Sequence, residues 1–408
     1  MLSKLQVSWH PMAGSLSKAN MRRSIGLVGP YPPFRGGIAH FTEQLYTQLE
    51  KEGHAVSGVS FKRQYPAFLF PGKSQKTNIV GPNLDAVCLV DTINPLSWTS
   101  AARHLIERGV EEVVFMYWMP FFAPAFGRMA SVLRSKGIQV TVIVHNAIPH
   151  ENQPFSHALS KWFLSKCNRL IALSKAVERD ISVLIPDRPV RVLPHPTYDQ
   201  FGDIEDQAVA RNRFNIGPDE KVLLFFGLVR RYKGLDILAK ALGHSSGTYR
   251  LIVAGEWYEK DDALRETLIK NAPGAIIHDK YIADKDVAGY FSAADLVVQP
   301  YRAATQSGVV QTAFHFGRPV IVTGVGGLPE MVQHEEDALV VAPSDERAAR
   351  AAEHGAKRDA GTGATGGGER SFAGTGRSGH GGGRDARAGT GPSRRGADHD
   401  STGVDDGS

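Results

Sequence analysis

The sequence predicts an α/β fold made of two tandem Rossmann-like domains that face each other across a cleft. Short apolar runs alternate with segments of helical periodicity between residues 24 and 344. The apolar runs are nearly continuous, which is typical of parallel strands covered by helices on both faces. A chain of 408 residues is also too long for one ordinary core and suits two domains.

The first domain is expected over residues 22–200. It begins with a strand at Ser24–Val28, which is followed by a loop rich in proline and glycine. Apolar residues then recur at helical spacing from Ile38 to Leu49. The further strands predicted in this domain are Ala55–Phe61, Val113–Tyr117, Val140–Val144 and Leu170–Leu173.

The second domain is expected over residues 219–345, after a polar linker at residues 201–218. Its predicted strands again alternate with helical patterns. They are Val222–Phe226, Leu251–Ala254, Ala275–His278, Leu296–Gln299 and Val320–Val322. In doubly wound sheets the ligand lies beyond the carboxyl ends of the strands, so a cleft between two such sheets is the expected site.

The two ends of the chain depart from this pattern. Residues 1–21 contain no continuous apolar segment, which argues against a secretory signal, and we expect a flexible extension. Residues 346–408 are rich in glycine and poor in large apolar side chains, so we expect a disordered low-complexity tail. Our hypothesis is a truncated or frameshifted second domain, and the alternative is a natural low-complexity tail.

Charge and composition exclude several classes of function. The net charge of +5 is concentrated in the first 23 residues, and the last 58 residues are balanced, so no nucleic-acid partner is expected. No run of 18 apolar residues predicts a membrane-spanning helix. Two distant cysteines argue against a disulfide framework, and we expect a cytoplasmic protein.

Two loops of the first domain contain candidate site residues. Gly36 and Gly37 precede a helix, where backbone N–H groups can approach a phosphate or a sugar hydroxyl; an ordinary glycine turn is the alternative. His145 directly follows an apolar strand and suits a hydrogen bond to a substrate hydroxyl; a buried histidine with structural partners is the alternative. Its spacing from His150 is not that of a zinc site, so no metal is expected.

The loop between two elements of the second domain carries three cations. A strand ends at Gly227 and a helix begins near Gly234, with Arg230, Arg231 and Lys233 between them. Cations at the carboxyl end of a strand are well placed to bind a diphosphate. A solvated run of charges is the alternative interpretation.

A glycine-rich loop follows a later strand of the same domain. Gly326 and Gly327 can present backbone N–H groups to a phosphate. We expect Glu330, at the end of the loop, to belong to the same binding site. Pro329 occupies the place of the third glycine, so the loop is not a dinucleotide-binding fingerprint.

Several segments together resemble the retaining, nucleotide-sugar-dependent glycosyltransferases of the two-Rossmann (GT-B) type, the group 1 or family 4 enzymes. The resemblance covers about residues 22–345 and rests on the order and spacing of the motifs. They are PPFRGGIAHFTEQL, the pair His145-Asn146, ALSKAVERDI, VLPHP, FGLVRRYKGLD, SAADLVVQPY and HFGRPVIVTGVGGLPEMV.

The resemblance implies roles for individual residues. Gly36 and Gly37 would lie near the donor phosphates and the reacting sugar, and His145 would be the strand-end histidine of the family. Lys233 would neutralise the departing diphosphate. Arg230 would stand in for the arginine that the family usually has in the same loop.

The sequence also departs from the family at three positions. The usual loop arginine falls on Leu228, and two glutamates common in the family fall on Ala304 and Thr312. Ser307 and Gly308, at the start of the following helix, are expected to bind donor hydroxyls or phosphate through backbone N–H groups.

The implied function is transfer of a sugar from a UDP- or GDP-sugar to an acceptor hydroxyl, with retention and without a tightly bound cofactor or metal. The implied acceptor is a cell-surface glycan or polysaccharide or its lipid-linked precursor, which leaves open a peripheral contact with the inner face of the membrane. The alternatives are an inactive truncated remnant or scaffold and a GT-B sugar-nucleotide epimerase. The epimerase would need carboxylates that the donor site lacks.

Overall fold

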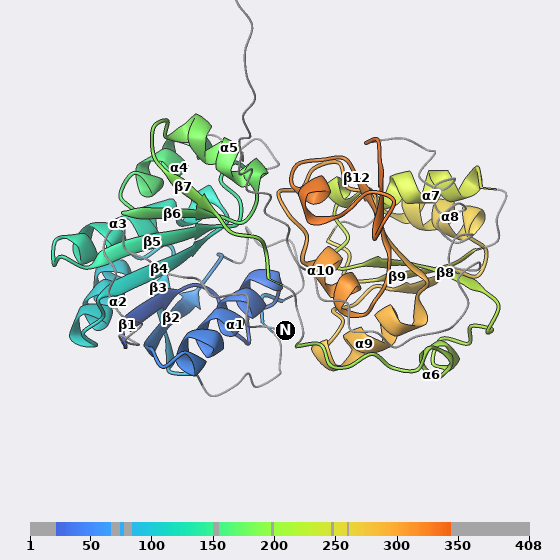
Figure 1. Ribbon diagram of the computed structural model, residues 1–408, viewed down its shortest axis with the longest axis horizontal. Coiled ribbons are helices and arrows are strands. Elements are labelled where there is room, and N and C mark those ends of the chain that lie inside the picture. The colour runs from blue at the N-terminus through green and yellow to red at the C-terminus, as the bar shows by residue number, and fades with distance from the viewer. Residues whose placement is uncertain are drawn as a thin grey trace, which may run out of the picture. The chain divides into compact units, whose positions relative to one another are not determined.

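The computed structural model describes residues 22–66, 74–76, 84–149, 155–196, 200–245, 249–258 and 261–343. These residues form two α/β halves, each built on a parallel sheet, and the predicted fold class is confirmed (Figure 1). The extension at residues 1–21, the tail from residue 346 and His150 lie outside the described residues.

The first sheet has the strand order β3-β2-β1-β4-β5-β6-β7 in the described chain, and all neighbouring strands are parallel. Its strands are β1 (Ser24–Val28), β2 (Ala55–Arg63), β3 (Ala86–Asp91), β4 (Glu112–Tyr117), β5 (Gln139–Val144), β6 (Arg169–Ala172) and β7 (Val190–Val192). The strand order reverses between β1 and β4, so the loops after these strands diverge and leave room for a ligand.

Helices cover both faces of this sheet. Helix α1 (Gly37–Lys51) packs on one face through Phe41 and Tyr46, in a core with Leu27 of β1. The apolar residues of β4 and β5 alternate between this core and the core on the other face, which explains their nearly continuous apolar sequence. The helices on the other face are α2 (Pro95–Glu107), α3 (Ala123–Arg134), α4 (Ser156–Leu164) and α5 (Lys175–Leu184).

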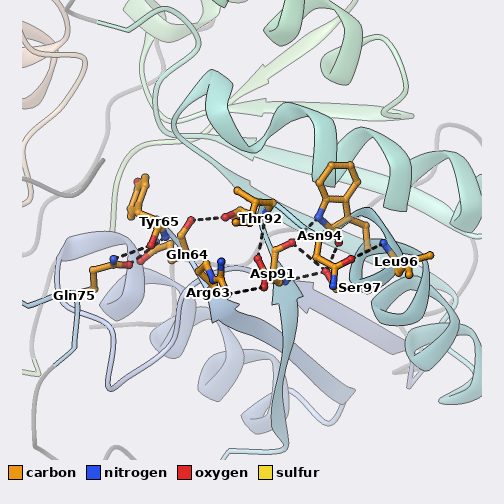
Figure 2. A network of polar contacts seen from close by, with 11 residues as sticks. Arg63, Gln64, Tyr65, Gln75, Asp91, Thr92, Asn94, Leu96 and Ser97 are labelled. Atoms are coloured by element: carbon orange, nitrogen blue, oxygen red, sulfur yellow. Dashed lines mark hydrogen bonds and ion pairs between the residues drawn. The ribbon is translucent and has the colours of Figure 1, made fainter. Parts of the chain in front are cut away.

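Polar contacts hold the ends of β2 and β3 against the start of α2 (Figure 2). Arg63 Nη2 lies 3.5 Å from Asp91 Oδ2, which joins the two strand ends. Asn94 is the N-cap of α2 and accepts the backbone N–H of Leu96 at 3.1 Å. The indole N–H of Trp98 donates to the backbone oxygen of Asp91 at 2.7 Å. The edge strand β3 is therefore fixed by polar contacts as well as by burial.

The second sheet has the order β10-β9-β8-β11-β12-β13 in the described part of the chain, again with parallel neighbours. Its strands are β8 (Lys221–Phe226), β9 (Tyr249–Ala254), β10 (Ile276–His278), β11 (Leu296–Gln299), β12 (Val320–Thr323) and β13 (Ala338–Val341). Here the order reverses between β8 and β11, which places the loops after these two strands at the expected ligand position.

Helices also lie on both faces of the second sheet. One core contains Leu238 of α7 (Leu235–Gly243) and Leu268 of α8 (Asp262–Asn271). The other contains Ala210, Phe291 and Val310. These three residues belong to α6 (Gln207–Asn212), α9 (Asp284–Ala293) and α10 (Gly308–His315).

The structure contains four elements that are not predicted from the sequence, namely β3, β7, β13 and α6. Strand β3 is an edge strand with a largely half-buried pattern, and β7 has only three residues, so neither gives a strong apolar signal. Helix α6 lies inside the stretch expected as a linker, at residues 201–218. Its Ala210 is fully buried against the second half of the molecule, so this stretch is a packed part of the fold as well as a connection.

Candidate active site

A cavity of about 500 Å³ is lined by both halves of the fold. The lining comes from the segments that follow β1, β4, β5 and β7 in the first sheet and β8, β9, β10 and β11 in the second. All of these segments leave the carboxyl ends of parallel strands, which is where doubly wound sheets bind their ligands. The volume is within the usual range for a small-molecule site.

Most of the predicted site residues meet in this cavity. Those in its lining are Gly36, Gly37, His145, Arg230, Lys233, Ser307 and Gly308. Those that do not belong to its lining are Gly326, Gly327 and Glu330.

Lys233 ends the short 3-10 helix η4 (Arg231–Lys233), and its side chain is buried in the cavity wall. Its Nζ lies 5.4 Å from the ring centroid of Tyr301. Gly227 has a φ of +96°, and a Cβ at that position would lie 2.9 Å from Nζ, so a side chain would crowd the ammonium group. Burial lowers the pKa of Lys233, and the positive charge of Arg230 contributes. An anion in the cavity would therefore stabilise the charged form of Lys233.

Arg230 precedes η4 in extended backbone and lines the cavity from the same loop. Its guanidinium carbon lies 5.3 Å from the ring centroid of Tyr258 and 5.9 Å from that of Tyr232. Leu228 also belongs to the lining, whereas Arg231 does not. Of the three cations in this loop, Arg230 and Lys233 are thus the two that line the cavity.

His145 follows β5 and is 4% exposed. Its Nδ1 lies 3.2 Å from the amide nitrogen of Gln306, and its ring meets that of Phe41 edge to face at 4.8 Å. Burial, with a smaller contribution from His195, lowers the pKa of His145 to about 3, so the ring is neutral at physiological pH. The hydroxyl of Thr305 donates to the backbone oxygen of His145 at 3.1 Å, which further fixes the strand end.

Ser307 and Gly308 stand at the N-terminus of α10, and the first turn of this helix faces the cavity. The backbone N–H of Ser307 donates to the sulfur of Met331 at 3.3 Å, and its hydroxyl donates to Gln299 Oε1 at 2.7 Å. The backbone N–H and the hydroxyl of Ser307 are therefore both engaged in hydrogen bonds within the protein. The positive end of the α10 dipole remains directed toward an anion in the cavity.

Gly36 and Gly37 begin α1, the first helix of the other half. Gly36 is the N-cap, without a side-chain cap, and the first turn of α1 contains no acidic residue. Both glycines line the cavity opposite the loops of the second sheet. The predicted placement of a helix N-terminus beside the ligand is consistent with this geometry.

Two polar contacts that involve carboxylates of the cavity lining are not predicted from the sequence. Arg35 Nη1 lies 3.0 Å from Glu256 Oε2, and the carboxylate is 3% exposed. His40 Nε2 lies 3.5 Å from Asp284 Oδ1. Glu256 follows β9 almost directly, so the rule that functional side chains follow strand ends identifies its position.

Gly326, Gly327 and Glu330 have contacts other than the expected phosphate. The N–H of Gly327 donates to the backbone oxygen of Ala304 at 3.1 Å, and a Cβ on Gly326 would lie only 1.6 Å from the same oxygen. The carboxylate of Glu330 accepts the backbone N–H groups of Lys175 at 2.6 Å and Ala176 at 3.0 Å. This loop therefore joins the start of α5 to the loop after β11.

Ala304 and Thr312, where the family commonly has glutamates, both line the cavity and are almost fully buried. The hydroxyl of Thr312 donates to the backbone oxygen of Gly308 within α10. Among the described residues, the carboxylates of the lining are Glu256, which forms an ion pair with Arg35, and Asp284, which contacts the ring of His40.

The described residues contain neither a cluster of metal-ligating side chains nor a helix suited to span a membrane. No three His, Cys, Asp or Glu side chains in the described ranges gather so as to hold a metal ion. No helix in that part of the chain is long and apolar enough to cross a membrane.

Family models match both halves of the chain. The family described as Glycosyltransferase Family 4 matches residues 35–199, and the family described as Glycosyl transferases group 1 matches residues 220–354. The two matches therefore follow the division of the fold into its two sheets.

Curated relatives agree with these matches. An uncharacterized glycosyltransferase of Methanocaldococcus jannaschii is 22% identical over 77% of this chain and 84% of its own length. A D-inositol 3-phosphate glycosyltransferase of Catenulispora acidiphila is 30% identical over 53% of this chain. That second match spans 57% of the relative's length.

Solved structures of glycosyltransferases share the fold. Sucrose-phosphate synthase from Thermosynechococcus elongatus superposes with a TM-score of 0.66 at 21% identity, covering 83% of this chain and 91% of that one. Anabaena HepE in complex with UDP gives a TM-score of 0.59 at 14% identity, covering 83% and 90%. The chain belongs to the group 1 or family 4 glycosyltransferases and has their GT-B fold.

Proposed function

We propose that this glycosyltransferase moves a sugar from a nucleotide-sugar donor to an acceptor hydroxyl with retention of anomeric configuration. One observation carries the proposal: Lys233, Arg230 and the N-terminus of α10 line the same cavity. Two cations and the positive end of a helix dipole are a suitable environment for a diphosphate.

The loops of the second sheet are the proposed nucleotide side of the cavity. Lys233 follows β8 and Gly308 follows β11, on the two sides of the point where the strand order reverses. The loops of the first sheet, with Gly36, Gly37 and His145, would then contact the sugar and admit the acceptor. We propose a UDP- or GDP-sugar as the donor; the Anabaena neighbour is described in complex with UDP.

Charge stabilisation is the proposed source of catalysis. When the bond between the sugar and the diphosphate breaks, negative charge grows on the leaving oxygen. The ammonium of Lys233 and the guanidinium of Arg230 would stabilise this charge in a buried setting, where such interactions are stronger than in water. Burial depresses the pKa of Lys233, so a bound diphosphate would favour its charged form.

The acceptor and the cellular role extend the proposal beyond the cavity. By resemblance to the family, we propose that the acceptor is a growing cell-surface glycan or polysaccharide, or its lipid-linked precursor. The reaction would take place in the cytoplasm, at the inner face of the membrane where the acceptor is lipid-linked.

The test combines binding with product analysis. The purified full chain is screened by thermal shift against UDP, GDP, ADP and their sugar nucleotides, because a ligand that binds only the folded state raises the melting temperature. The donor that stabilises most is then incubated with glycan acceptors, and the anomeric configuration of the product is read by NMR. A product with the donor's configuration is expected. A folded protein that neither binds nor transfers from any donor would contradict the proposal and favour the inactive remnant.

A further inference from the structure

Four side chains of the cavity lining contain buried polar atoms that have no hydrogen-bond partner within the described chain. They are Nε2 of His145, Oδ1 of Asn146, Nε2 of Gln200 and Oε1 of Gln306. Two of these side chains are joined to each other, since the amide nitrogen of Gln306 lies 3.2 Å from Nδ1 of His145. A buried polar atom without a partner is costly, so each is a candidate to meet a ligand.

The contact between the two side chains fixes the tautomer of the imidazole. An amide NH₂ group can only donate, so Nδ1 of His145 must accept. His145 is neutral and carries one proton, which must then be on Nε2. The unpartnered Nε2 is therefore an N–H donor, and the unpartnered Oε1 of Gln306 is an acceptor.

A hydroxyl group is the chemical complement of such a pair, because it donates one hydrogen bond and accepts others. The carboxylates of the described lining, Glu256 and Asp284, are already engaged with Arg35 and His40. The hydroxyl of Thr312 already donates a hydrogen bond to the backbone oxygen of Gly308 in its own helix. Among the side chains with unpartnered buried atoms in this lining, Gln306 and His145 are bonded to each other and together present one donor and one acceptor to a sugar hydroxyl.

We infer that Gln306 and His145 act as one unit that binds hydroxyl groups of the transferred sugar. In this unit Gln306 determines specificity in two ways. Its Oε1 accepts from a sugar hydroxyl, and its NH₂ group keeps the Nε2 proton of His145 available to donate. The inference rests on the proposed function. It adds to that function the residue whose contacts are made with the sugar nucleotide and not with the nucleoside diphosphate alone.

The test compares a nucleoside diphosphate with its sugar nucleotide. Calorimetry on the full chain gives Kd for UDP and UDP-glucose, ADP and ADP-glucose, and GDP and GDP-mannose, and the pair that binds most tightly is used further. Gln306→Met keeps the length of the side chain and removes both polar atoms. We expect Kd for the sugar nucleotide to rise at least about tenfold, as for leaving a buried polar group unsatisfied. Kd for the nucleoside diphosphate alone should change less than about twofold.

Gln311→Met is the matched control, because Gln311 is an amide on α10 that does not belong to the cavity lining. It should leave both dissociation constants unchanged. Equal weakening of both ligands by Gln306→Met would show a merely structural role and overturn the inference. Unchanged binding of both ligands would overturn it as well.

The tautomer gives a second readout that needs no ligand. Two-bond ¹⁵N–¹H correlation spectra of the histidine-labelled protein show which ring nitrogen is protonated, and His145 is assigned by its loss in His145→Asn. We expect the proton on Nε2 in the unmodified chain. In Gln306→Glu the side chain is an acceptor at neutral pH, so the proton should move to Nδ1. A proton found on Nδ1 in the unmodified chain would overturn the inference.

Failure of this inference and failure of the proposed function are distinguishable. If the unmodified chain binds no nucleoside diphosphate and no sugar nucleotide, the proposed function fails, and the inference fails with it. If the unmodified chain transfers sugar and Gln306→Met retains the full preference for the sugar nucleotide, the inference alone fails.

Discussion

The guanidinium of Arg35 lies 3.0 Å from the carboxylate of Glu256, and this ion pair joins the loop before α1 to the end of β9. The two side chains differ in exposure, at 25% for Arg35 and 3% for Glu256. The same guanidinium lies 4.6 Å from the ring centroid of Tyr281. Glu256 lines the cavity, and Arg35 directly precedes the lining residue Gly36, so the pair connects the start of α1 to the end of β9 beside the proposed donor site.

The first prediction concerns the asymmetry of this pair. Arg35→Met removes the cation beside a buried carboxylate, and we expect it to lower the free energy of unfolding by about 2–3 kcal/mol. Glu256→Gln leaves behind an arginine that is partly solvated, and it should cost about 1 kcal/mol. Urea denaturation of both variants checks the order. A larger loss for Glu256→Gln than for Arg35→Met would contradict this account.

The second prediction concerns the diphosphate. Lys233→Ala should weaken donor binding and lower the rate of transfer on the order of 10²-fold, the effect of removing one preorganised group that stabilises developing charge. Arg230→Ala should behave similarly. Arg231→Ala is the matched control, since this exposed cation does not line the cavity and should change the rate far less. Unchanged kinetics in Lys233→Ala would remove Lys233 from the site.

The third prediction concerns pH and stability. In the folded chain the pKa of His145 is lowered to about 3, whereas the ordinary pKa of a histidine is 6.5. The unfolded chain therefore binds a proton as pH falls through 6.5, and the folded chain does so only near pH 3. Stability must then decrease on acidification within this range, by about 2 kcal/mol between pH 7 and pH 5 for this group alone.

His145→Asn isolates this contribution, because it removes the titrating ring. The difference in unfolding free energy between pH 7 and pH 5 should shrink by about 2 kcal/mol in this variant. The lowered pKa of His195 acts in the same direction and remains in both proteins. Equal pH dependence in the two proteins would mean that His145 is not neutral and buried as described.

The strands and the main site loops could be predicted because their signals are local. β4 and β5 are buried along nearly their whole length, so most of their residues are apolar. His145 directly follows β5 and Lys233 lies in the connection between β8 and α7, and parallel sheets place such positions beside the ligand.

The remaining features depend on contacts between distant segments. Gln306 acquires its proposed role from His145, which is contributed by the other half of the fold. Glu330 follows a glycine-rich loop that resembles a phosphate site, but its carboxylate binds backbone N–H groups at the start of α5. No local pattern identifies the group that a loop will face.

Helix α6 illustrates the same limit in a segment expected as a linker. Arg211 is 5% exposed, and its Nη2 lies 2.8 Å from both carboxylate oxygens of Asp295. Its other nitrogens donate to the backbone oxygens of Ala293 at 3.2 Å and Pro218 at 2.7 Å. Asp295 in turn accepts the backbone N–H of Val222, at the start of β8. One side chain of the supposed linker thus organises the start of the second sheet.

The last prediction tests whether this segment is part of the second half of the fold. Arg211→Leu removes the cation and leaves the buried carbonyl of Ala293 and the carboxylate of Asp295 without their donor, so it should lower the free energy of unfolding by about 2–4 kcal/mol. Arg213→Leu is the matched control in the same segment, because Arg213 is half exposed in its ion pair with Glu205 and should contribute less than about 1 kcal/mol. Urea denaturation followed by tryptophan fluorescence measures both. If the two variants lose equally little stability, α6 is dispensable and residues 201–218 act as a simple connection.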